Sequence, residues 1–189
     1  MIARRKLRRR DGVAVVETAL VVGVFGLLFF GIFEYCRFLM VLHITNNAAR
    51  DGARYAAVNV GKPNNFDTVD YTDGLGVVHP SIQKYTLQRM GSMQKQVTGF
   101  QIAVFAVDPT GLTLDPPVIR PKTTSTASPA AYPDPFNASD PNKVPWNDAV
   151  FTERVGVSIK GTYTPVLPGF LFMPSSIPIY VTAMACSEG

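Results

Sequence analysis

The most conspicuous pattern is an apolar run close to the start of the chain. Val13 to Phe33 are 21 consecutive residues among which only Glu17 is charged. As an α-helix that rises about 1.5 Å per residue, this run would cover roughly 30 Å, the hydrocarbon thickness of a bilayer. A secretory signal peptide has a shorter apolar core with an A-x-A cleavage site soon after it, and no A-x-A lies close behind this run. We therefore predict a helix that anchors the chain in a membrane.

The helical pattern continues beyond the apolar run and becomes amphipathic. No proline occurs between Val13 and Asn59, although three glycines fall in the apolar half. Apolar and small side chains recur on one side at 3.6 residues per turn, and polar ones on the other. The first side comprises Phe38, Val41, Leu42, Thr45, Ala49, Gly52 and Ala56, and the second His43, Asn47, Arg50, Asp51 and Arg54. We predict one helix over 13–58, about 45 residues and roughly 65–70 Å long, which needs a neighbour to pack against.

Two spacings on this helix suggest contacts. Glu34 and Arg37 lie three residues apart, which allows them to pair on one helix face. Two rows of small residues at every fourth position would let another element approach closely. These rows are Ala48, Gly52 and Ala56, and Ala49, Ala53 and Ala57. They could pack against the protein's own sheet or against another subunit.

The rest of the chain predicts a small α+β domain over 78–189, an antiparallel sheet with helical cover. Residues 59–77 are rich in Asn, Asp and Gly and indicate a linker. Pro80 suits the first turn of a helix that runs through Ile82, Tyr85, Met93 and Val97. Strands are expected over 99–107, 151–163 and 177–185. Between the first two, residues 108–148 hold nine of the 15 prolines, which favours a long irregular loop. Trp146 would either anchor that loop or contact another surface.

Charge is concentrated in a basic leader, residues 1–12. The net charge is +4, but six of the 18 basic residues precede position 11, and from Val13 onward 12 basic residues face 13 acidic ones. This argues against nucleic acid as a partner, because phosphate binding needs basic residues spread over a folded face. Basic residues before an apolar span predict that the N-terminus stays cytoplasmic and the remainder crosses.

The sequence offers little for catalysis or metal binding. No G-x-S-x-G, Gly-rich phosphate loop or H-E-x-x-H is present, and His43 and His79 are isolated. Asp67, Asp70 and Asp73 repeat every three residues, unlike the alternate spacing of a calcium loop. Cys36 and Cys186 favour two unpaired residues, although the sequence does not exclude a bond between them. We predict no enzyme, no cofactor and no metal.

Glu17 is the most informative residue, because a carboxylate within a membrane span costs about 2.5–3.5 kcal/mol and is usually paired or functional. It lies five residues after Gly12, at the end of the basic leader. This arrangement resembles type IV prepilins, in which a membrane peptidase cuts after such a glycine. The resemblance implies cleavage between Gly12 and Val13, so that Glu17 becomes the fifth mature residue and neutralises the new α-ammonium of a neighbouring subunit. The alternative is a glutamate that snorkels to the cytoplasmic interface.

A second resemblance is more specific and covers about residues 10–60. The chain has a Glu-aromatic-x-Arg step, Glu34-Tyr35-Cys36-Arg37, followed by an N-x-A-R-x-G-A-R-x-A pattern. In this sequence the pattern consists of Asn47, Ala49, Arg50, Gly52, Ala53, Arg54 and Ala56. These motifs resemble the TadE-like family, minor pseudopilins of the tight-adherence (Tad/Flp) pilus. Two departures are Thr18 after Glu17, where the major Tad pilin has tyrosine, and Val13 in place of the phenylalanine usual in type IV pilins.

The resemblance implies a pilin-like fold and a minor pilus component needed for assembly or adhesion. Its partners would be other pilins and pseudopilins, the assembly machinery, prepilin peptidase and inner-membrane lipid. The protein would cross the inner membrane once, with its C-terminal domain periplasmic or extracellular, and it could enter the assembled pilus. The alternative is an uncleaved single-pass envelope protein that binds partners through that domain. An anchored periplasmic enzyme is a third possibility, for which the sequence shows no catalytic constellation.

Overall fold

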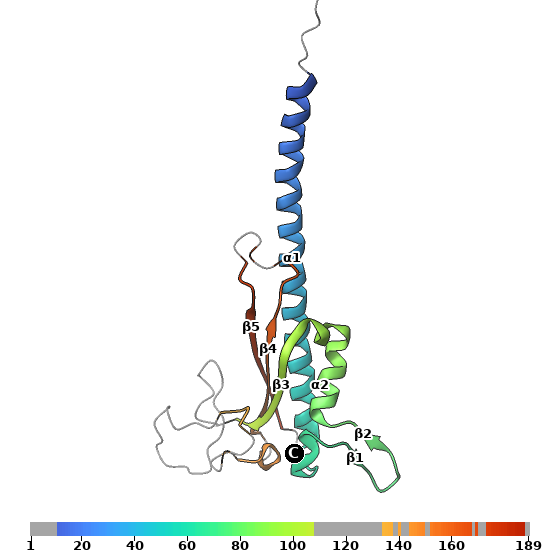
Figure 1. Cartoon of the computed structure of the whole chain (residues 1–189). Helices are drawn as coiled ribbons and strands as arrows, with labels where there is room; N and C mark the ends of the chain where they lie inside the picture. Colours follow the sequence, from blue (N-terminus) through green and yellow to red (C-terminus); the bar gives the residue numbers. More distant parts are fainter. Residues whose placement is uncertain are drawn as a thin grey trace, which may run out of the picture.

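One helix runs almost the whole length of the molecule. The computed structural model describes residues 11–107, 134–137, 140, 144–149, 152–167, 169 and 173–187. Helix α1 comprises 48 residues, Asp11–Val58, and is thus roughly 70 Å long. It begins two residues before the predicted start. Its N-terminal half projects away from the remainder of the protein, which gathers around its C-terminal half (Figure 1).

A three-stranded antiparallel sheet forms the body of the domain. Strands β3 (Val97–Ala106), β4 (Arg154–Tyr163) and β5 (Ile177–Cys186) lie in the order β3-β4-β5. Strand β4 pairs with β5 in unbroken register from Arg154↔Cys186 to Tyr163↔Ile177. Its central residues, Val155 to Ile159, are buried, because both β3 and β5 flank it and α1 packs against its face. The predicted α+β class is confirmed, with the strands close to their predicted positions.

The helix predicted from Pro80 to Val97 is shorter than expected. Helix α2 spans Ile82–Met90, and Ser81 is its N-cap, since the Ser81 side chain accepts a hydrogen bond from the Lys84 amide. Pro80 lies before that cap and not in the first turn. Gly91 ends the helix at φ +56°, a conformation that glycine adopts easily. The chain then forms a 3₁₀ segment, η2 (Gly91–Gln96), that leads directly into β3.

The predicted linker over 59–77 is wrong in part, because this segment is folded against the domain. It contains a 3₁₀ turn, η1 (Asn64–Asp67), and strand β1 (Tyr71–Thr72), which pairs with β2 (Val78–His79). Phe66, in η1, is fully buried among core residues. The polar composition of the segment concealed its few core residues, Phe66 together with the partly buried Val60 and Tyr71 that pack against the same cluster.

Most of the predicted proline-rich loop, 108–148, lies outside the described residues. Its described end forms a short 3₁₀ turn, η5 (Trp146–Asp148). Trp146 is buried, and its indole N–H donates to the Asn64 carbonyl oxygen at 2.8 Å. Trp146 therefore anchors this part of the chain to the η1 turn, which decides between the two roles considered for it.

Two neighbouring core clusters line the C-terminal half of α1. The cluster nearer the free half of the helix contains Val41, Ala48 and Ala49 of α1, together with Tyr163 and Ile179 of the sheet. The more distant cluster contains Ala53 and Ala56, with Phe66, Ile82 and Trp146 among their neighbours. The predicted apolar side of the helix, from Val41 to Ala56, thus faces the domain. His43, Asn47, Arg50 and Arg54, on the predicted polar side, are exposed.

Candidate functional site: the free half of the long helix

The apolar run lies on the part of α1 that the domain does not cover. Val13, Leu20 and Phe25 are each more than 60% exposed, and none of the residues 13–33 is buried. By length and composition this helix can cross a membrane. An exposed apolar surface of this extent marks a contact with lipid or with another protein.

Glu17 lies within this exposed surface, on the half of α1 that the domain does not cover. Its side chain is exposed, and within the described part of the chain no hydrogen bond or ion pair involves it. The adjacent Thr18 hydroxyl, by contrast, donates back to the Ala14 carbonyl oxygen at 2.8 Å. Glu17 is therefore available to a partner from outside the chain.

The predicted cleavage position lies in the first turn of the helix. Because α1 begins at Asp11, Gly12 and Val13 are both helical. A Cβ added at Gly12 would meet no atom within 4 Å, and Val13 is 72% exposed. The peptide bond between them is thus free of cover by the rest of the described chain.

The domain is attached to the helix immediately after the apolar run ends. Glu34 is only 8% exposed, and its Oε1 accepts hydrogen bonds from the Tyr163 hydroxyl at 2.8 Å and from the Val166 amide at 3.1 Å. Burial, together with the hydrogen bond to Glu34, raises the pKa of Tyr163 to about 12. One carboxylate thus fixes the last residue of β4 and the start of the β4–β5 loop to the helix.

The predicted pairing of Glu34 with Arg37 is wrong. The Arg37 Nε–H donates instead to the side-chain oxygen of Gln96, the last residue of η2 before β3, at 3.0 Å. Both residues of the Glu-aromatic-x-Arg step are therefore bonded to the domain and not to each other. Between them, Tyr35 and Cys36 are exposed.

Some residues of the second motif are buried in packing contacts, and the others lie at the surface. Ala49, Gly52, Ala53 and Ala56 are buried against the protein's own domain. At Gly52 an added Cβ would lie 2.3 Å from the Thr86 hydroxyl oxygen of α2, so only glycine permits this approach of the two helices. The rows of small residues thus serve packing within the chain, one of the two roles considered for them.

The polar residues of the same motif remain at the surface. Arg50 and Arg54 line an open groove of about 690 Å³ beside residues 182–186 of β5. Neither guanidinium forms an ion pair within the residues that the structure describes. The nearby Asp51 carboxylate instead lies 3.6 Å from the Arg89 Nε of α2.

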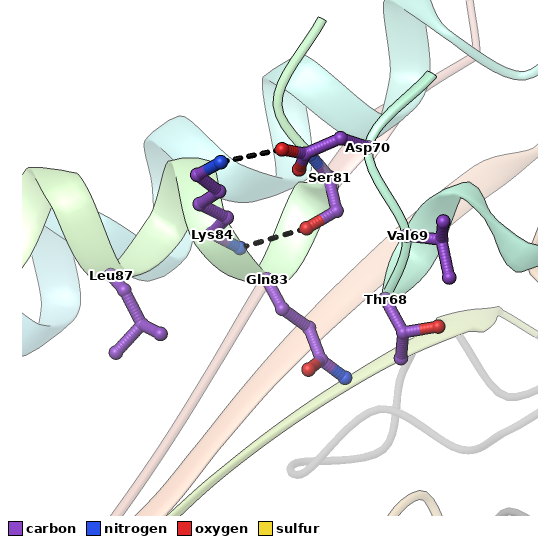
Figure 2. A pocket seen from close by; sticks show the side chains of 7 residues that line it. All are labelled: Thr68, Val69, Asp70, Ser81, Gln83, Lys84 and Leu87. Atoms are coloured by element: carbon purple, nitrogen blue, oxygen red, sulfur yellow. Dashed lines mark hydrogen bonds and ion pairs between the residues drawn. The ribbon is translucent and has the colours of Figure 1, made fainter.

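The remaining candidate residues have structural partners. Figure 2 shows an open depression beside α2 in which Lys84 points to Asp70, and Asp70 also accepts from the Ser81 amide at 2.8 Å. The hydrogen bond from Lys84 contributes most to lowering the pKa of Asp70. Asp73 contacts His79 Nε2 at 3.1 Å and accepts from two backbone amides. Over the described ranges no three His, Cys, Asp or Glu side chains are grouped to hold a metal ion. Cys36 and Cys186 are both free and exposed.

These observations define a class of protein: a long helix with a free apolar half, and a small α+β domain mounted on its other half. The family model described as TadE-like protein matches residues 12–54, which confirms the resemblance stated from the two motifs. The match covers the free half of α1, the attachment at Glu34 and the second motif as far as Arg54, and the sheet lies outside it. The similarity links the chain to the Tad pilus. No curated protein and no solved structure matches it.

Proposed function

We propose that this protein is a minor pseudopilin of a Tad-type pilus, processed by a prepilin peptidase and needed for pilus assembly or adhesion. The observation that supports this best is the division of α1. Its second half packs against the domain, whereas the run from Val13 to Phe33 is exposed and holds Glu17, a carboxylate without a partner among the described residues. The exposed half of such a helix would contact lipid before assembly and the helices of neighbouring subunits after it.

Cleavage between Gly12 and Val13 would create an α-ammonium four residues before Glu17. Unpaired, each of these charges is costly in an apolar environment, and paired across subunits they compensate each other. The requirement for that match sets the axial register between neighbours. The protein has no catalytic role in this proposal and requires no cofactor. Its leader stays in the cytoplasm, and its domain lies on the outer side of the inner membrane.

Processing is tested by mass spectrometry of protein extracted from native membranes. We expect Val13 at the N-terminus, and intact Met1 in cells with active prepilin peptidase would refute processing and favour the uncleaved envelope protein. Orientation is tested separately with a phosphatase reporter fused after Gly189. The reporter should be active, and an inactive reporter on a properly inserted protein would reverse the topology.

The role of Glu17 is tested with Glu17→Ala and the neighbouring control Thr18→Ala. Both variants should reach the membrane and be cut normally, because each leaves the apolar run and the distant domain intact. Only Glu17→Ala should lose surface pili and recovery in the sheared pilus fraction. Normal piliation in Glu17→Ala would refute the assembly role and leave the snorkelling glutamate as the explanation.

A further inference from the structure

The start of the β4–β5 loop is a second apolar surface, located where the free half of α1 ends. Val166 and Leu167 are 62% and 41% exposed. The sequence from Val166 to Met173, VLPGFLFM, contains no charged or polar side chain. An apolar surface that a domain leaves uncovered commonly marks an interaction site.

The attachment at Glu34 fixes the position of Val166 along the axis of α1. The Val166 amide donates to Glu34 Oε1 at 3.1 Å, and Tyr163, three residues earlier, donates to the same oxygen at 2.8 Å. The ends of β4 and β5 that carry Tyr163 and Ile177 point toward the free half of α1 (Figure 1). Val166 is therefore held level with Glu34, and Leu167 is the next residue along the chain.

Glu34 in turn marks the boundary of the membrane if the proposed function holds. The residues from Val13 to Glu34 span roughly 30 Å as a helix, which equals the hydrocarbon thickness. With the start of the run at the cytoplasmic boundary, Glu34 reaches the outer one. The exposed Tyr35 agrees with this level, since tyrosine concentrates at membrane–water interfaces.

From these positions we propose that Val166 and Leu167 insert at the outer boundary between the headgroups and the acyl chains of the bilayer, as a second membrane contact beside the span. The inference rests on the proposed membrane anchoring. With the helix and these two residues both in lipid, the domain would be held at a fixed tilt and rotation on the membrane surface. The span alone allows rotation about its own axis. The Glu34–Tyr163 attachment would keep the two contacts at one level.

The test measures the depth of single labelled positions in the full-length protein. In a Cys36→Ser, Cys186→Ser background, one cysteine is introduced at Leu27, Leu75 or Leu167 and labelled with a polarity-sensitive fluorophore. Each protein is placed as a single copy in nanodiscs of phosphatidylethanolamine and phosphatidylglycerol, with and without brominated acyl chains. Leu27 reports on the span, and Leu75, a 91% exposed leucine in the β1–β2 turn, reports on water.

We expect the brominated lipid to quench the labels at Leu27 and Leu167 and to leave the label at Leu75 unchanged. Quenching at Leu27 with none at Leu167 would overturn the lipid contact while leaving the anchor in place. No quenching at Leu27 would overturn the anchoring itself. If the label at Leu167 reports an apolar environment only when several copies share a disc, Val166 and Leu167 contact a neighbouring subunit and not lipid. Val166→Cys serves as a second position if Leu167→Cys alters the Trp146 emission of the folded domain.

Discussion

The attachment at Glu34 can be tested by removing each end of its buried hydrogen bond. Glu34→Ala removes the acceptor of two hydrogen bonds and leaves the Tyr163 hydroxyl, which is fully buried, without its partner. A hydrogen bond to a charged group contributes about 1.5–3 kcal/mol, and an orphaned buried donor costs about 1–3 kcal/mol. We expect Glu34→Ala to lower the free energy of unfolding of the domain by roughly 2–4 kcal/mol.

Tyr163→Phe removes the other end of the same bond and should cost about 1.5–3 kcal/mol. Because both variants break one interaction, the double variant should lose less than the sum of the two. The difference, the coupling energy, should be about 1.5–3 kcal/mol. Tyr180→Phe is the matched control: its hydroxyl is on a half-exposed side chain, and the loss should stay within about 0.5 kcal/mol.

The measurement is urea unfolding of the full chain in nanodiscs, followed by the emission of Trp146, the single tryptophan, which is buried in the domain. The span remains in lipid, so that the transition reports on the domain and its attachment to α1. Losses that simply add, within about 0.3–0.5 kcal/mol, would show that Glu34 and Tyr163 do not interact. The attachment of this end of the domain to α1 would then have to depend on other contacts.

Three further predictions concern the domain. Gly52→Ala should destabilise it by about 1–3 kcal/mol through the clash with Thr86, and adding Thr86→Ala should restore part of the loss; equal stability of Gly52→Ala and the parent would refute the close approach. Phe66→Ala should cost about 3–5 kcal/mol in the same unfolding assay, whereas Leu75→Ala should change stability by less than about 0.5 kcal/mol; a negligible loss at Phe66 would restore the linker interpretation. The pKa of Asp70 is lowered in the folded state. Its contribution to the free energy of unfolding is therefore complete above pH 3.8, its ordinary pKa, and is lost as the pH falls through the pKa of the folded state. Asp70→Asn should therefore flatten the stability–pH curve below about pH 4, and an unchanged curve would contradict this.

The long helix and the sheet could be predicted because their signals are periodic and local. The alternation of Val155, Val157 and Ile159 indicates a strand without knowledge of its neighbours, and these three residues are buried as that pattern requires. The small residues on one side of α1 likewise predicted the side that packs. Gly91 was the available signal for the early end of α2, and the apolar residues beyond it suggested a longer helix.

The contacts that fix the domain to the helix could not be predicted, because they join residues far apart in the sequence. Glu34 and Arg37 satisfy the local pairing rule, yet Glu34 bonds to Tyr163, which is 129 positions away, and Arg37 to Gln96, 59 positions away. Phe66, Val60 and Tyr71 were the hints of order in a segment otherwise rich in turn-forming residues. Composition averages over such single residues, whereas folding depends on whether each can be buried.

If the proposed function holds, the division of α1 would explain how a single carboxylate could direct assembly. The free half of the helix is apolar whether it lies in lipid or against neighbouring helices, so moving between these environments changes little in hydrophobic free energy. The small residues of α1 pack against the protein's own domain, so Ala49 and Gly52 are not available to neighbouring subunits. What distinguishes a neighbouring subunit from lipid is then a charge that can meet Glu17. In lipid this carboxylate stays costly, and beside the α-ammonium of a processed neighbour its cost is offset. Assembly would therefore depend on processing, because the uncut chain has no ammonium at that position to offer.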